Sequence, residues 1–432
     1  MKPLNLFFGL TFWLVMLVFV IPSCSNNGNE PKVEEQKDMT QEEKVEPKTR
    51  VDVSLDNKEK QMARKNADFA FRLLQSADRS IIDNDRLVLS PLSASMALSM
   101  LINGTDGDSK QELLKALGYN ADELVAINRL NKKLLEELPE LDNTATVSIA
   151  NSLWLNKGFT VVGEFKDILT TDYNAEVNII DFSQTKSVGI INEWCEKKTN
   201  NLIKNFLGEL SPDECFILLN ALYFKGEWST RFAQENTNKA KFTSQSGEQQ
   251  EVEMMNNVAS YMYVKENGYA MVEFPYGNSA YSMFIFMPDA GIGISDCVAG
   301  VTPEGWLDAM TKMKFKLLSV KLPKFKIEVK QSLEETLNIM GVEKSFLPDK
   351  ADFTAISEDK SYLSNIMQAI NISVDEYGTE AAAVTGNATE IEGDESGKVE
   401  VIDFHVDRPF LFFVKEKSSD TFLFMGKVAD ME

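Results

Sequence analysis

The stretch EYGTEAAAVTGNATEIEG, residues 376–393, constrains the fold more than any other part of the chain. From Thr379 to Gly393 the residues form two alternating sets, or parities, of odd and even sequence number, and every charged side chain falls in the even set. The other parity carries no charge and comprises Thr379, Ala381, Ala383, Thr385, Asn387, Thr389, Ile391 and Gly393. Because successive side chains of a strand point to opposite faces, this pattern predicts a strand with one buried face. A buried, unpaired carboxylate would be costly, and the alternation breaks at Glu395.

The overall charge and the apolar content narrow the class of protein. The 432 residues carry a net charge of −22, so phosphate backbones are repelled and no nucleic-acid partner is expected. The chain is 44% hydrophobic and 25% charged, which is ordinary for a globular protein. Beyond the N-terminus no run of 18 apolar residues occurs, which argues against a bundle of membrane-spanning helices.

The chain has a single histidine, His405, which excludes most classes of catalytic site that depend on histidine. Zinc sites that need two or three imidazoles are excluded. A Ser-His-Asp triad could use only His405, and no G-x-S-x-G elbow accompanies it. The surrounding VIDFHVDRPFLFF predicts one strand leading into another. We therefore expect no enzyme, no cofactor and no metal.

The N-terminus predicts export. Lys2 precedes an apolar run from Leu6 to Ile21, which is typical of a signal peptide over residues 1–23. Ile21-Pro22-Ser23-Cys24 resembles a bacterial lipobox, in which Cys24 would be acylated and joined to outer-membrane lipid; an ordinary secretory signal is the alternative. Residues 24–56 are rich in Glu, Lys and Asn and predict a flexible acidic tether.

The other cysteines are Cys195, Cys215 and Cys297. Their odd number leaves at least one unpaired, and two lie in apolar-periodic contexts. We expect buried packing residues instead of a disulfide.

From residue 57 onward the patterns change from helical to extended. Ser90 and Pro91 predict the cap and first turn of a helix, and Ser109-x-x-Glu112 predicts a capping box for a helix that ends at Gly118. Later apolar runs predict strands at 215–223, 261–264, 269–274, 318–322, 325–329, 410–414 and 422–425. Helices mostly precede strands, which favours an α+β class.

Several short motifs then occur in one order, and together they resemble the serpin family over nearly all of residues 57–432. They are Ser90-Pro91-Leu92-Ser93; Ala150-Asn151-Ser152-Leu153-Trp154; Ile191-Asn192-x-Trp194 with Thr199; Asn220 to Gly226 with Trp228; Leu322-Pro323-Lys324-Phe325; Asp375-Glu376-x-Gly378-Thr379-Glu380-Ala381-Ala382-Ala383; and Arg408 to Phe412 with Phe424 to Lys427.

The resemblance implies three β-sheets, about nine helices and an exposed reactive-centre loop, here about 376–408. Inhibitory members of the family are cleaved in that loop as a substrate. The loop then enters the central sheet as a new strand while the protease stays covalently attached. About a dozen new hydrogen bonds at a net ~1 kcal/mol each would give on the order of 10 kcal/mol.

The resemblance also assigns residues. The hinge comprises Glu376, Gly378, Thr379, Ala381, Ala382 and Ala383, and its small side chains favour insertion. The cluster beneath the point where the sheet opens comprises Ser90, Ser93, Asn220 and Gln368. Gln368 stands where many members have His, and its amide is able to hydrogen-bond to Asn220.

The sequence leaves three candidates for the peptide bond that the protease cleaves. Seventeen residues counted from Glu376 give Glu392-Gly393, whereas counting back from Pro409 gives Lys398-Val399; Ile391-Glu392 is a third. The loop is some six residues longer than usual, so the counts disagree. The alternation favours Glu392-Gly393, which suits a glutamate-specific protease, whereas Lys398 suits a trypsin-like one.

The resulting expectation is an exported, lipid-anchored bacterial inhibitor that traps a serine or cysteine endopeptidase as a suicide substrate. We expect a monomer in the cell envelope, periplasmic or surface-exposed, or released outside the cell. A non-inhibitory serpin-fold binding lipoprotein and a secreted hydrolase are the alternatives, and the single histidine argues against the hydrolase.

Overall fold

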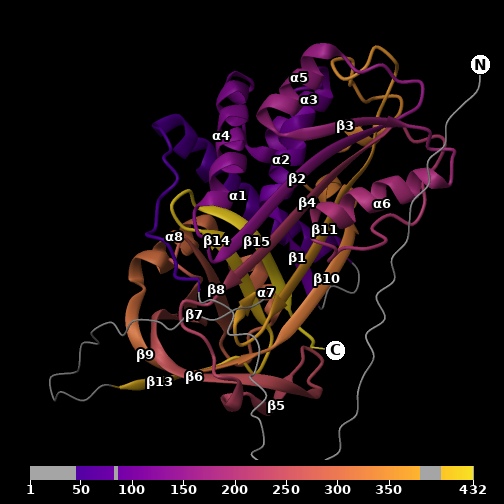
Figure 1. Ribbon diagram of the computed structural model, residues 1–432. Coiled ribbons are helices and arrows are strands. Elements are labelled where there is room, and N and C mark those ends of the chain that lie inside the picture. The colour runs from indigo at the N-terminus through magenta and orange to yellow at the C-terminus, as the bar shows by residue number, and fades with distance from the viewer. Residues whose placement is uncertain (1–44, 82–85, 380–399, 432) are drawn as a thin grey trace, which may run out of the picture. The chain divides into compact units, whose positions relative to one another are not determined.

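The computed structural model describes residues 45–81, 86–379 and 400–431 (Figure 1). Its compact unit runs from Lys44 to Glu432. Residues 45–56, which the sequence assigns to the tether, belong to this unit. Val53 and Leu55 are buried, and the backbone N–H of Val53 donates to the Ser418 hydroxyl at 2.9 Å. The folded part therefore begins earlier than residue 57.

The described residues form nine α-helices, as the resemblance implies. They are α1 (Asn57–Ser80), α2 (Pro91–Ile102), α3 (Gly107–Leu117), α4 (Leu124–Glu137), α5 (Gly163–Asp172), α6 (Lys186–Lys198), α7 (Ile294–Gly300), α8 (Pro303–Lys312) and α9 (Glu334–Ile339). Short 3-10 turns lie at η1 (Ala121–Glu123), η2 (Leu138–Glu140), η3 (Gln234–Asn236) and η4 (Lys344–Phe346).

A side-chain cap explains where helix α2 begins, whereas the cap predicted for the next helix fails. Ser90 caps α2, with Pro91 in the first turn, as the sequence predicts. The capping box at Ser109 is wrong, because α3 begins two residues earlier, at Gly107. The Ser109 hydroxyl instead accepts from the backbone of Asp352 at 3.1 Å. Helix α3 does end at Gly118, whose φ of 74° favours glycine.

The strands, in chain order, are β1 (Arg86–Leu89), β2 (Ala145–Asn156), β3 (Ala175–Ile180), β4 (Phe216–Glu227), β5 (Asn238–Thr243), β6 (Gln249–Glu266), β7 (Tyr269–Pro275), β8 (Tyr281–Pro288), β9 (Lys314–Pro323), β10 (Phe325–Ser332), β11 (Leu363–Val374), β12 (Gly378–Thr379), β13 (Val401–His405), β14 (Phe410–Glu416) and β15 (Thr421–Val428). The strands predicted at 261–264 and 269–274 pair as the hairpin β6–β7, and those predicted at 410–414 and 422–425 pair as the hairpin β14–β15.

The described strands hydrogen-bond into two networks. One is six-stranded, in the order β10-β11-β4-β2-β3, with β12 paired to β4. The other is nine-stranded, in the order β1-β15-β14-β8-β7-β6-β9-β13, with β5 paired to β6. The resemblance implies three sheets. Two networks result here because the 18-residue strand β6 runs without a break from its pairing with β5 and β9 into its pairing with β7.

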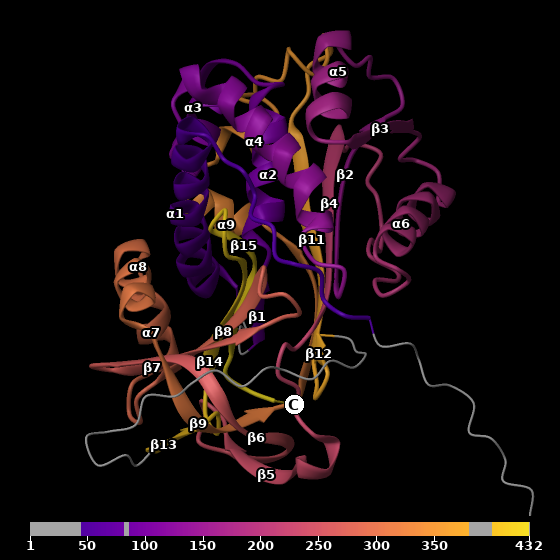
Figure 2. The ribbon, with the colours of Figure 1, turned by 60° about the vertical axis from the view of Figure 1, so that its left-hand side comes forward.

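The six-stranded sheet lies between two layers of helix. Figure 2 shows α6 on one side of β2 and β4, and α1 and α2 on the other. On the α6 side, Trp194 and Cys195 pack in a separate apolar cluster with Leu219, Ala221 and Ala369 of the sheet. The three described cysteines are free and buried, as predicted. Among the described helices, none combines the length and the apolar character that crossing a bilayer requires.

Candidate functional site

Strands β4 and β11 pair along only part of their length. Their parallel register runs from Phe216 opposite Leu363 to Ala221 opposite Ala369. Beyond that row β4 continues to Glu227, and β11 continues to Val374 paired only with β10. Within the described chain, residues 222–225 of β4 therefore have a strand partner on the β2 side and none on the β11 side.

A tight turn brings the chain back to this opening. Strand β11 ends at Val374, and the carboxylate of Asp375 accepts from the backbone N–H groups of Tyr377 at 2.9 Å and Gly378 at 3.2 Å. Strand β12 then pairs antiparallel with the end of β4, with Gly378 opposite Glu227 and Thr379 opposite Gly226. The first residues of the predicted hinge thus already lie beside β4.

Glycine is required at position 378. Its φ is +147°, and a Cβ there would come within 2.1 Å of the backbone oxygen of Gly226. The close approach lets the turn dock on β4, so a side chain would force the two strands apart.

Thr379 points into the protein. It is 2% exposed, and its hydroxyl lies 2.8 Å from that of Tyr276. The ring of Tyr276 stacks on Trp228 at 4.5 Å between centroids, and the indole N–H of Trp228 donates to the carbonyl of Asp375 at 2.9 Å. Burial raises the pKa of Tyr276, so this hydroxyl stays neutral. One packed unit therefore holds the turn, β12 and the end of β4.

Glu376 fixes the other side of the turn. It is 4% exposed; the Thr237 hydroxyl donates to it at 2.7 Å, and the Lys324 ammonium lies 3.1 Å away. Burial opposes the charge, but these two partners more than offset it and lower the pKa of Glu376. Burial likewise works against the ammonium, and pairing with Glu376 reverses that effect and raises the pKa of Lys324.

The sheet-opening cluster lies together, but not as the sequence suggested. Gln368 donates to the backbone oxygen of Ser90 at 2.7 Å and accepts from its N–H at 3.3 Å, while the hydroxyl of Ser90 donates to that of Ser93 at 2.8 Å. Asn220 lies opposite Gln368 in the register but donates to Asn151 instead, at 2.5 Å.

A comparison with protein families matches residues 64–431 to the family described as Serpin (serine protease inhibitor). Iripin-3 of Ixodes ricinus is 33% identical over 370 residues, which cover 84% of this chain and 92% of that protein. The chain belongs to the serpin family.

Solved serpins share its fold. The native state of the thermophilic serpin Tengpin superposes with a TM-score of 0.78 at 30% identity, over 89% of this chain and 97% of Tengpin. Human thyroxine-binding globulin, in complex with thyroxine, has a TM-score of 0.78 at 25% identity, over 87% and 99% of the two chains. Serpins are generally protease inhibitors, and the α+β class is confirmed.

Several site residues predicted for this serpin lie outside the described residues. They are Ala381, Ala382, Ala383, Ile391, Glu392, Gly393, Lys398, Val399 and Cys24. Sequence reasoning also missed Tyr276 and Thr237. Tyr276 continues the alternation of Val272 and Phe274 past Pro275, a signal that would have placed it on the core face. No pattern around Thr237 indicates its contact with Glu376.

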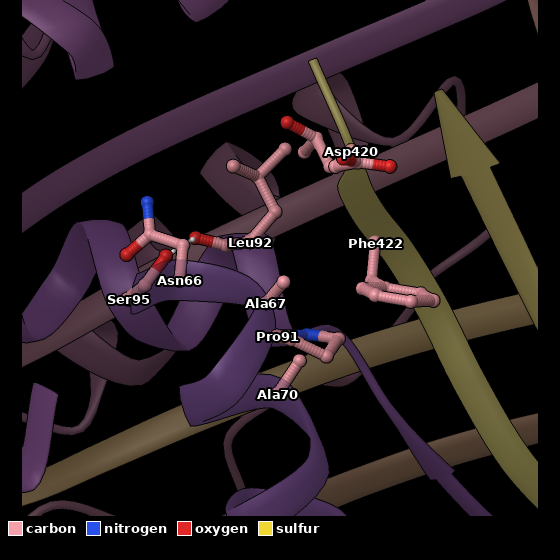
Figure 3. Close-up of a pocket in the computed structure, with 9 residues that line it drawn as sticks. Asn66, Ala67, Ala70, Pro91, Leu92, Ser95, Asp420 and Phe422 are labelled. Carbon is pink, nitrogen blue, oxygen red and sulfur yellow. Dashed lines mark hydrogen bonds between the residues drawn. The ribbon is translucent and has the colours of Figure 1, made fainter. Parts of the chain in front are cut away.

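Among the described residues of the serpin, a small cavity and a larger one lie beside the C-terminal hairpin. The small one of about 10 Å³, between α1, α2 and the start of β15, holds one water molecule at most (Figure 3). Pro91 and Leu92 line it from α2, and Asp420 and Phe422 from the hairpin. The larger one of about 380 Å³ lies between α1, α8 and the same hairpin, with Trp306 in its wall.

Proposed function

We propose that this serpin inhibits an endopeptidase by trapping it during cleavage of the reactive-centre loop. The catalytic serine oxygen of the protease, or a cysteine sulfur, would attack the carbonyl carbon of the scissile residue. An acyl-enzyme bond forms, the peptide C–N bond breaks, and the nucleophile's proton leaves on the new amine. The freed loop would then enter between β4 and β11 before water cleaves the acyl bond.

The observation that carries this proposal is the position of β12. Gly378 and Thr379 pair with β4 at the end of a segment that β11 leaves without a strand partner in the described chain. Thr379 heads the uncharged parity set and is buried. Continued strand pairing would place Ala381 and Ala383 on the same face, where small uncharged side chains meet the least resistance.

The test is an SDS-resistant complex. The purified chain is incubated with trypsin and with a glutamate-specific endopeptidase, and the products are separated under denaturing conditions. A covalent product heavier than the 48.5 kDa chain, together with a released C-terminal peptide, supports trapping. Mass analysis of that peptide distinguishes Glu392-Gly393, Ile391-Glu392 and Lys398-Val399. Cleavage without any covalent product, by both proteases, contradicts the proposal.

The lipid anchor is a separate proposal. We infer that residues 1–23 are removed and that acylated Cys24 holds a monomeric domain in a bacterial cell envelope, because a small-residue segment precedes Cys24 and a polar tether follows it. Growth with a labelled fatty acid should label the wild-type protein and not Cys24→Ser. Equal labelling of both would contradict the anchor.

A binding function is the second candidate, favoured by the cavity of about 380 Å³ beside Trp306. Its volume suits a small ligand, and Phe71 and Phe422 add apolar walls. Thyroxine-binding globulin, a relative in fold, binds thyroxine. Calorimetric titration with thyroxine as the probe tests this candidate, with Trp306→Ala as the variant; no measurable heat in the wild type contradicts thyroxine as a ligand.

A further inference from the structure

An apolar surface lies on the outer face of β6, β9 and β13. Val258, Phe315 and Val401 are 63%, 51% and 50% exposed, one on each strand. In the register, Val401 lies opposite Leu317 of β9, and Phe315 lies two residues before Leu317 on that strand. Val258 lies opposite Ser319, two residues after Leu317. Because side chains two apart share a face, Val258, Phe315, Leu317 and Val401 form one surface, here called the outer apolar face.

The opposite face of the same strands is ordinary core. Leu318, Val320 and Phe404 are at most 1% exposed. Isolated exposed apolar side chains are common, but three exposed ones on adjacent strands, joined by the partly buried Leu317, are a contiguous feature that marks contact with another molecule. Figures 1 and 2 both place these strands together at the lower end of the compact unit.

The outer face is apolar at only one end. Asn256, Lys321 and His405 form its polar end, because both Asn256 and His405 lie opposite Lys321. The next row holds Val258, Ser319 and the exposed Asp403, so Val258 lies at the border between the polar and apolar ends. The apolar end is the one at Val401, where β13 begins directly after residue 400. It is therefore the end next to the point where the predicted reactive-centre loop rejoins the sheet.

Chain length then limits how far a bound protease can be from this face. From Gly393 to Val401 is eight residues, at most about 28 Å of extended chain, and from Val399 it is two residues, at most about 7 Å. A protease domain of about 200 residues has a radius of gyration of about 16 Å. With either bond in its active site, the body of the protease reaches the outer apolar face.

We propose that the outer apolar face is a docking surface for the attacking protease, on the side of the residues that follow the cleaved bond. The inference rests on the proposed function. A second copy of the chain fits less well, because four side chains supply far less than the roughly 1,200 Å² that a stable interface buries. A protease already held by its active site needs only an auxiliary contact, which an exposed aromatic side chain supplies.

The experiment measures binding without cleavage. Trypsin and a glutamate-specific endopeptidase, each with its catalytic serine replaced by alanine, are titrated with the full chain and with a synthetic peptide of residues 376–408. The wild type should bind at least one protease more tightly than the peptide does. Phe315→Ser should weaken that binding about tenfold, and the double variant Val258→Ser, Phe315→Ser should weaken it further. Val125→Ser, at an 80% exposed apolar position on α4, is the matched control and should bind as the wild type does.

Equal affinity of the chain and the peptide for both proteases overturns the docking surface, as does unchanged binding by Phe315→Ser. Self-association of the wild type that Phe315→Ser abolishes, seen by sedimentation, assigns the face to a second copy instead. Active proteases that cleave the chain without an SDS-resistant product contradict trapping, and they leave the binding result intact. The two failures are thus distinguishable.

Discussion

The hydroxyl of Thr379 lies 2.8 Å from the hydroxyl of Tyr276, and both side chains are buried. Thr379 is the first residue of the alternating stretch, and it is the only residue of that stretch that the structure describes. Its inward orientation therefore fixes which parity of that stretch would face the core if the strand were extended along β4.

Ala383→Arg should convert an inhibitor into a substrate, because Ala383 shares the uncharged parity and would be buried by insertion, whereas Thr379 is already buried before cleavage. An unpaired buried charge costs roughly 3–5 kcal/mol, so insertion slows and the ratio of cleaved to trapped molecules rises about a hundredfold or more. The stoichiometry of inhibition measures this ratio. Glu380→Arg, at the charged parity, is the control and should trap normally; equal behaviour of the two variants would contradict the parity argument.

Gly378→Ala should destabilise the turn between β11 and β12. The new Cβ would meet the backbone of Gly226, and alanine disfavours a φ of +147°. We expect the free energy of unfolding, from denaturant titration, to fall by roughly 2 kcal/mol. Gly208→Ala, where a Cβ meets nothing within 4 Å, should change it by less than about 0.5 kcal/mol. Similar values for the two variants would refute the close approach.

Acid should loosen the contact between Glu376 and Lys324. The pKa of Glu376 is lower in the folded state, so its contribution to stability is fully present above the unfolded value near 4.5 and is lost as pH falls through the lower folded value. The pKa of Lys324 is raised, so its contribution is lost only at pH above the unfolded value of about 10.5.

Glu376→Gln isolates this effect, because it keeps an acceptor for Thr237 and removes the charge. The variant should lose roughly 1–3 kcal/mol at pH 7 and show a smaller loss of stability in acid than the wild type. Parallel stability curves for the two proteins below pH 4.5 would show that the carboxylate is not linked to folding.

Gln368→Ala should weaken the link between α2 and the six-stranded sheet. It leaves the backbone N–H and oxygen of Ser90 without their side-chain partner, which costs roughly 2–3 kcal/mol. Thermal unfolding measures the loss, with the exposed Gln245→Ala as control. An unchanged midpoint for Gln368→Ala would mean that water replaces the amide at no cost.

The sequence predicted periodic features well and contacts between distant segments poorly. Alternation located β9 and β10, because burial of one face acts residue by residue, and continuous apolar runs located β14 and β15, whose residues are buried on both faces. The capping box at Ser109 failed because the Ser109 hydroxyl accepts a hydrogen bond from the backbone N–H of Asp352, 243 residues away. For the same reason the partner of Gln368 was missed. Several residues offer a hydrogen bond to an amide there, and only the packing of α2 on the sheet selects Ser90 over Asn220.

The position of Cys195 on α6 has a practical consequence. Its thiol is 1% exposed against the outer side of the sheet, and burial raises its pKa to about 12, so alkylating reagents cannot reach a reactive thiolate while α6 remains in place. The cluster that covers it includes Ala221 and Ala369, the last paired row before the strands separate. The alkylation rate of Cys195 therefore reports how often α6 moves away from the sheet, without a protease or an attached dye.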